Sequence, residues 1–239
     1  MERLRLLTFG GLTLLVGGES VTGATTRRRR LALLALLAVA RDRGLNRDKI
    51  HAYLWPERSE EQARHGLNQL LYFQRRHLGD EDLFLGKKTP RLNPAVITCD
   101  VWEFEDALEA GAREDAVRLY GGPFLDGFFL RGAPGFERWV EEQRARLEKR
   151  CAEAIRTLAM AAAKEDPQQA VAWWRRAAEL EPFDTGTILH LLEACRAVGD
   201  RAAAVRYAQQ HTDVLHAELG LPPDPRVTEL LSQVRREGS

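Results

Sequence analysis

The stretch ARHGLNQLLYFQRRHLGD, residues 63–80, repeats its apolar residues at the spacing of an α-helix. Those at 63, 67, 70, 71 and 78 share one face, so we expect that face to pack on other helices. The opposite face carries the polar and cationic side chains of Arg64, His65, Asn68, Tyr72, Arg75 and Arg76. This face is either an ordinary solvated helix surface or a surface that binds a partner.

The sequence before this stretch predicts two strands and two helices. Residues 4–18 are rich in Leu and Thr, which is typical of two short strands joined near Gly10-Gly11, with a further turn at Gly17-Gly18. Helical periodicity follows over 27–40 and 47–55, and the quoted stretch belongs to a third helix. Residues of the usual boundary types delimit these helices: Thr25 or Thr26 and Gly44 for the first, Asn46 and Pro56 for the second, and a Ser59–Gln62 capping box and Gly79 for the third.

A hairpin is expected after the third helix, over residues 82–99. Its first strand is predicted at 83–85, its tip contains Lys87, Lys88 and Pro90, and its return strand runs through 96–98. Strands, three helices and a hairpin with a basic tip are the order of a winged helix. In such proteins the third helix lies in the major groove and the wing reaches the minor groove or the backbone. This position favours the binding surface over the solvated one.

Only helices are expected after Asp100. Asp100 and Glu103 are expected to form a capping pair at the start of the first of them. Similar residues recur 34 positions apart, the period of the tetratricopeptide repeat, in the pairs Asp166/Asp200, Leu158/Leu192, Ala170/Ala204, Val171/Val205 and Trp173/Tyr207. Trp174, Ala177 and Pro182 also fit the first copy, whereas Ala208 and His211 make the second copy degenerate. Residues 113–120 resemble a helix of an earlier unit. Two unrelated helical hairpins of similar length remain the alternative.

Composition describes a soluble globular chain, with 44% hydrophobic and 29% charged residues. Its longest apolar run, 31–40, is far shorter than the ~20 residues of a membrane span, so we interpret it as a buried helix and expect no membrane contact. Cys99, Cys151 and Cys195 are widely spaced, and no CxxC occurs. We therefore expect neither a disulfide framework nor a metal site. We also expect the protein to be cytoplasmic and nucleoid-associated.

The formal net charge of zero hides an asymmetry. Through residue 100, 17 Lys and Arg stand against 11 Asp and Glu, whereas the remainder has 18 against 24. Opposite signs suggest two modules with different partners, and a basic module makes nucleic acid the first partner to test, although compositional scatter is the alternative. We predict a mainly α protein with a small β content: an N-terminal winged helix-turn-helix over 1–98 and an all-α tetratricopeptide-like domain over 99–239.

The chain resembles the SARP-type activators (Streptomyces antibiotic regulatory proteins), which join an OmpR-like winged helix to a bacterial transcriptional activator domain. The matching segments cover practically the whole chain: RLLTFGGLTL, RRLALLALL, LNRDKIHAYLWP, ARHGLNQLLYFQRRHLGD, LYGGPFLDGF, FERWVEEQRARL and LHAELGLPPDPRVTELL. The resemblance implies binding to double-stranded promoter DNA, commonly as a homodimer on direct repeats. It also implies recruitment of RNA polymerase, with the helical domain helping dimerisation and activation.

Three features depart from the family pattern. The wing tip reads TPRLNP where a Gly-Tyr pair is usual, and His65-Gly66 replace a common Asn-Ala pair. Gly66 costs up to ~1 kcal/mol relative to Ala in a helix, which suggests close packing at that position. No ATPase module follows, unlike in larger relatives, and we leave open that the chain is one piece of a longer protein.

These observations define a set of candidate DNA-binding residues. Guanidinium groups suit phosphate or guanine edges, Asn68 suits adenine, and Tyr72 suits phosphate. Cations at the start of the first helix oppose its dipole, a cost that backbone phosphate would offset; plain surface charge and intramolecular pairing to Asp or Glu are the alternatives. The candidates are Arg64, His65, Asn68, Gln69, Tyr72, Arg75 and Arg76 on the third helix, Lys87 and Lys88 on the wing, and Arg28 and Arg29 from the run 27–30.

Two other classes of function remain to be weighed. In a protein-interaction scaffold, the winged helix would dock protein rather than DNA, without the steep salt dependence that phosphate contacts impose. An enzyme is disfavoured, because the histidines show no GxSxG, HExxH or phosphate-loop context. We expect no catalytic residue and no cofactor. His190 is interpreted as a core histidine, and the Trp173-Trp174 pair as core packing.

Overall fold

The computed structural model describes residues 4–21 and 28–236. The chain forms two compact units, Met1–Leu147 and Glu148–Ser239, which divide inside helix α6 (Pro134–Glu165). The expected cap at Thr25 or Thr26, and Arg27, lie outside the described residues.

A four-stranded sheet opens the first unit. Its strands are β1 (Leu4–Leu7), β2 (Thr13–Val16), β3 (Glu19–Ser20) and β6 (Ile97–Cys99), in the order β3-β2-β1-β6. Two predicted strands are confirmed as β1 and β2, which pair antiparallel, and Gly10 and Gly17 have the positive φ values of 69° and 61° that tight turns require. β6 joins β1 in parallel, with Leu4 opposite Ile97.

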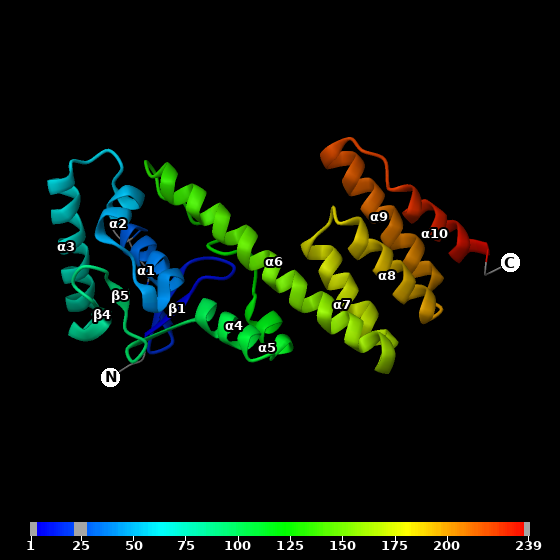
Figure 1. Cartoon of the computed structure of the whole chain (residues 1–239), viewed down its shortest axis with the longest axis horizontal. Coiled ribbons are helices and arrows are strands. Elements are labelled where there is room, and N and C mark those ends of the chain that lie inside the picture. Colours follow the sequence, from blue (N-terminus) through cyan, green and yellow to red (C-terminus); the bar gives the residue numbers. More distant parts are fainter. Residues whose placement is uncertain (1–3, 22–27, 237–239) are drawn as a thin grey trace. The chain divides into compact units, whose positions relative to one another are not determined.

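The three predicted helices are confirmed as α1 (Arg28–Ala40), α2 (Arg47–Leu54) and α3 (Glu60–Leu78). α1 gives way at Arg41–Arg43 to a short 3-10 helix, η2, before Gly44. The side chain of Asn46 accepts a hydrogen bond from the Asp48 N–H, and that of Ser59 accepts one from the Gln62 N–H. Gly79 ends α3 in the left-handed conformation. α1 packs against α2 and β5, and α2 packs against α3 (Figure 1).

The wing is a shorter hairpin than the sequence predicted. After η3 (Glu81–Leu83), β4 (Phe84–Leu85) pairs antiparallel with β5 (Arg91–Leu92). The strand predicted through 96–98 is present as β6, at 97–99, but its predicted pairing is wrong, since β6 pairs with β1 in the larger sheet and not with β4. The chain turns at Asn93, whose carbonyl oxygen accepts hydrogen bonds from the N–H groups of Val96 and Ile97, and this turn separates the two strands.

Asp100 connects the sheet to the helices that follow, α4 (Asp100–Glu109) and α5 (Arg113–Leu119). Its buried carboxylate accepts hydrogen bonds from the backbone N–H of Thr8 (2.7 Å), the Thr8 hydroxyl (2.6 Å) and the Phe9 N–H (3.0 Å). The predicted capping pair is wrong, because Cys99 is the N-cap residue and Glu103 pairs with Arg5. Long-range contacts to the end of β1 have taken the place of a local cap.

The core of the first unit includes residues from both sides of position 98. Phe124 is fully buried and bridges to Phe9 and Gly11, and the Leu125 N–H donates to the Thr8 carbonyl (2.7 Å). The Trp102 indole donates to the Ala38 carbonyl in α1 (2.6 Å). Residues of the winged helix and of 99–147 therefore fold around one core.

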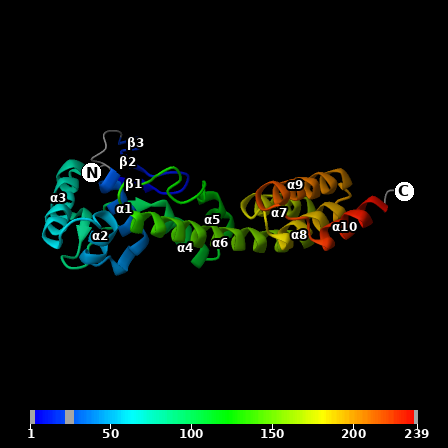
Figure 2. The ribbon, with the colours of Figure 1, turned by 90° about the horizontal axis from the view of Figure 1, so that it is seen from above.

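The second unit contains the part of α6 from Glu148 onward and four further helices that pack as neighbours (Figures 1 and 2). These are α7 (Pro167–Leu180), α8 (Thr185–Ala197), α9 (Arg201–Leu219) and α10 (Pro225–Arg236). Asp166 and Asp200 cap α7 and α9, accepting hydrogen bonds from the N–H groups of Gln169 and Ala203. The equivalent small residues of both copies are buried, and Trp174 is 4% exposed. The tetratricopeptide-like prediction is confirmed.

His190 is not the core residue that its apolar neighbours suggested. Its side chain is 55% exposed, stacks on the Trp174 ring at 4.6 Å between centroids, and lies 3.5 Å from the Glu193 carboxylate. Hydrophobic neighbours in sequence misled the prediction, because His190 falls on the opposite face of α8 from the buried Leu191 and Leu192.

The three cysteines are buried and free. Burial raises the pKa of every thiol, to about 12 for Cys151 and about 11 for Cys195, so these groups stay protonated and unreactive near neutral pH. Among the described residues, no group of three or more His, Cys, Asp or Glu side chains could hold a metal ion. Within the same part of the chain, no helix has the length and apolar character needed to cross a membrane.

Candidate nucleic-acid interface

α3 presents one polar face to solvent. Its caps fix both helix ends, and Ala63, Leu67 and Leu71 bury the other face against the unit. The exposed face brings together six of the candidate residues, namely Arg64, His65, Asn68, Gln69, Tyr72 and Arg76. Donors, acceptors and the Tyr72 ring thus share the exposed face of an α-helix, an element that the major groove of DNA admits.

The arginines on this face make only weak, exposed interactions within the chain. Arg64 Nη2 lies 2.6 Å from Glu60 Oε1, in a pair whose side chains are 62% and 73% exposed. Exposed pairs of this kind contribute about 0–1 kcal/mol, so a phosphate could replace Glu60 at little cost. Arg76 donates a long hydrogen bond, 3.4 Å, to the Tyr72 hydroxyl. The helix face is therefore available to an anionic partner.

Arg75 differs from its neighbours because it is held against the wing. Its Nη2 donates to the Phe84 carbonyl in β4 (3.1 Å), and its guanidinium lies 5.9 Å from the centre of the Phe84 ring. The side chain is only partly exposed. In this arrangement Arg75 positions the wing relative to α3, and its predicted contact to DNA stays a prediction.

The wing tip displays two exposed lysines, Lys87 and Lys88. Gly86 begins the tip with a φ of 77°, and a Cβ placed there would lie 2.5 Å from the Thr89 carbonyl oxygen. Only glycine satisfies this turn without displacing the backbone. The tip is tied to α2 by Arg47, whose Nη1 donates to the Lys87 carbonyl (3.0 Å).

Arg47 is a residue of this surface that sequence reasoning missed. Its Nη2 also donates to Asn68 Oδ1 on α3, so one guanidinium joins α2, α3 and the wing. Nothing in its sequence position, the first residue of a short helix, indicated this role. The role depends on the packing of α2, α3 and the wing, which are separate in the sequence.

The arginines at the start of α1 are engaged within the chain. Arg28 Nη1 donates to the Phe129 carbonyl (2.9 Å) and its guanidinium stacks on the Phe129 ring at 4.5 Å. Arg29 Nε donates to the Leu54 carbonyl (3.1 Å). Carbonyl oxygens and an aromatic face thus offset the unfavourable helix dipole, where the sequence suggested phosphate or carboxylate. Phosphate contacts by Arg28 and Arg29 stay a prediction.

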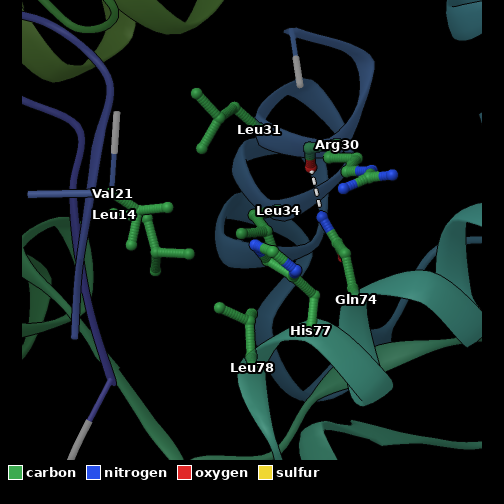
Figure 3. Close-up of a pocket in the computed structure, with 8 residues that line it drawn as sticks. All are labelled: Leu14, Val21, Arg30, Leu31, Leu34, Gln74, His77 and Leu78. Carbon is green, nitrogen blue, oxygen red and sulfur yellow. Dashed lines mark hydrogen bonds between the residues drawn. The ribbon is translucent and has the colours of Figure 1, made fainter. Parts of the chain in front are cut away.

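A small cavity lies behind α3 (Figure 3). Its volume is about 60 Å³, and the Gln74 amide donates to the Arg30 carbonyl at its edge (2.8 Å). Figure 3 shows side chains from the sheet, α1 and α3 converging on it: Leu14, Val21, Arg30, Leu31, Leu34, Gln74, His77 and Leu78. Pockets that hold small-molecule ligands usually measure about 300–1,000 Å³, so this space fits a packing gap between elements better than a ligand site.

Comparison with known proteins gives a family match and a structural match. The model of the bacterial transcriptional activator domain family matches residues 99–235. No curated protein matches the chain significantly. Among solved structures, Mycobacterium tuberculosis EmbR in complex with a low affinity phosphopeptide has a TM-score of 0.63 at 22% identity. That match covers 99% of this chain and 66% of the EmbR chain, so this chain spans slightly less than two thirds of its length.

Proposed function

Because the chain belongs to the bacterial transcriptional activator domain family, we propose that it is a transcriptional regulator of the SARP type that binds promoter DNA through α3 and the wing. The observation that carries the proposal is the exposed face of α3, where Arg64, Asn68, Tyr72 and Arg76 lie together in a unit with a basic amino-terminal sequence. α3 would enter the major groove, while Lys87 and Lys88 would contact the backbone beside it.

Activation would follow from contacts that the rest of the chain makes. We propose that the chain acts as a homodimer on repeated half-sites and recruits RNA polymerase, with the helical repeats of the second unit contributing to both interactions. Transcription in vitro from a bound promoter, with and without the protein, tests recruitment. Analytical ultracentrifugation of the free and DNA-bound protein tests dimerisation.

DNA binding is tested by measuring duplex affinity as a function of salt concentration. Each neutralised phosphate contributes a slope of about −0.9 in log K against log salt. Arg64→Ala is expected to lower the affinity about fivefold or more and to reduce the magnitude of the slope by about 1. Its far-UV circular dichroism should match that of the wild type, because the Arg64 side chain is 62% exposed and its ion pair with Glu60 lies at the surface.

Arg131→Ala is the matched control, because it removes one exposed positive charge from the same unit at a position outside α3. A slope near zero for the wild type, or equal effects of the two substitutions, would contradict the recognition role of α3. Near-zero slope together with capture of a protein partner would favour the scaffold function instead.

A further inference from the structure

The guanidinium of Arg47 links the two parts of the surface that we assign to DNA. Arg47 is the first residue of α2, and its Nη1 donates to the carbonyl oxygen of Lys87 at the wing tip (3.0 Å). Another nitrogen of the same group donates to Asn68 Oδ1 on α3. A planar fork with fixed donor directions holds two acceptors in a defined relation, which a flexible ammonium does not.

This contact fixes the orientation of the Asn68 amide. Arginine has donors only, so the oxygen of the amide must face Arg47 and the NH₂ group must face away. The side chain of Asn68 is exposed on the face of α3 that carries Arg64 and Tyr72. Asn68 therefore presents hydrogen-bond donors to whatever enters from solvent.

The orientation determines which base edge Asn68 fits. A bidentate contact to adenine needs the amide oxygen to accept from N6 while the NH₂ donates to N7. With the oxygen directed at Arg47, the amide is left with donors, which match the two acceptors of guanine, N7 and O6. The sequence alone had assigned Asn68 to adenine.

We propose that Arg47 is a specificity-determining residue: it holds the Asn68 amide as a donor, so that Asn68 favours guanine over adenine, and it fixes the wing tip beside α3. This inference rests on the proposed function, because it concerns the same surface. Arg47 acts on the base through Asn68 and is in that sense a positioning residue.

The test is selection of duplexes from a random pool by the full chain and its variants, followed by sequencing. Asn68→Ala identifies the operator position that Asn68 contacts, as the position where base preference is lost. Arg47→Ala is expected to lower the ratio of guanine to adenine at that same position about tenfold, because the amide is free to turn. Overall affinity for the duplex should fall as well, because the wing tip loses the hydrogen bond from Arg47 to the Lys87 carbonyl oxygen.

Further variants separate this effect from charge and folding. Arg47→Met keeps the aliphatic stem without donors and should give the same change of preference, so a folding defect in Arg47→Ala would not decide the outcome. Arg43→Ala removes an exposed charge in η2 and should leave the preference unchanged. In the Asn68→Ala background, Arg47→Met should produce no change of base preference.

An unchanged guanine-to-adenine ratio in folded Arg47→Met would overturn the inference while leaving DNA binding intact. Selection of adenine at that position by the wild type would also overturn it. Failure of the wild type to enrich any duplex would instead overturn the proposed function, and the role of Arg47 with it.

Discussion

At the scale of single residues, the first unit buries a histidine of α2. His51 in α2 is 8% exposed, and its Nε2 makes no hydrogen bond within the described part of the chain. Burial lowers the pKa of its imidazole, although the nearby Asp48 opposes the effect. The folded protein therefore favours the neutral ring, so the stability of the first unit depends on pH.

The sign of this dependence follows from proton linkage. Because the folded pKa is below the unfolded value of about 6.5, the unfolded chain binds more protons as the pH falls through that value. The contribution of His51 to stability is complete above pH 6.5 and is lost progressively below it. His51→Gln, which does not titrate, should lose less stability than the wild type between pH 7.5 and pH 5, as measured by urea unfolding. His65→Gln, an exposed change on α3, is the control, and equal losses in wild type and His51→Gln would contradict the prediction.

At the scale of secondary-structure elements, local chemistry was predictable and long-range pairing was not. Asn46, Ser59 and Gly79 mark helix ends as expected, because a cap depends on residues within about four positions along the chain. The exposed face of α3 was likewise predictable from periodicity. β6 was assigned to the wrong hairpin, because its partner β1 lies more than ninety residues earlier and leaves no mark on the sequence around 97–99.

The same limit applied to the candidate site. The contact of Arg75 with β4 and the contact of Arg47 with Asn68 both depend on where the wing lies in three dimensions. Gly66 is the opposite case: a glycine inside a helix predicted close packing, and a Cβ there would lie 3.3 Å from the Trp55 ring. The sequence could indicate the packing of Gly66, because glycine destabilises a helix and needs a reason to be there. It could not indicate the contacts of Arg47, because an exposed arginine is common at any helix start.

The two glycines at the ends of this surface give a matched experiment. Gly79 and Gly86 have similar φ values, 69° and 77°, but a Cβ at Gly79 meets no atom within 4 Å, whereas one at Gly86 lies 2.5 Å from the Thr89 carbonyl oxygen. Gly79→Ala should cost about 1–2 kcal/mol of unfolding free energy, the cost of the left-handed backbone alone. Gly86→Ala should cost more, or displace the wing and weaken duplex binding, as measured by chemical denaturation and gel shift. Equal effects on both properties would show that the tip of the wing is free to rearrange.

At the scale of the whole molecule, the first compact unit extends well beyond the winged helix. Asp100, Trp102 and Phe124 complete a core that Thr8, Phe9 and α1 begin. The family match starts at residue 99, whereas the compact units divide at residue 147. The proposed division into a DNA-binding domain over 1–98 and a helical domain over 99–239 thus describes sequence modules, while the unit that packs around one core is longer.

This difference predicts how fragments behave. A fragment of residues 1–98 lacks the carboxylate that Thr8 and Phe9 bind, as well as the Phe124 side chain that fills the space beside them. We expect it to unfold at lower temperature and less cooperatively than a fragment of residues 1–147, as measured by calorimetry. Asp100→Ala in the longer fragment should reproduce part of the loss, because it leaves buried N–H groups without an acceptor, at about 1–3 kcal/mol. Equal melting temperatures for the two fragments would refute this reading of the core.

The contact of Phe124 with the end of β1 has a consequence for exchanging parts between regulators. A chimera that joins residues 1–98 of one protein to the helical domain of another would combine the residues after β1 from one sequence with the residue at position 124 from the other. These two sets of residues were not selected to pack together. A junction inside α6, near residue 147, transfers Phe124 together with the residues after β1 that it contacts. The preferred crossover point for such an exchange is therefore in the middle of a helix, whereas a boundary drawn from sequence modules would fall at residue 98.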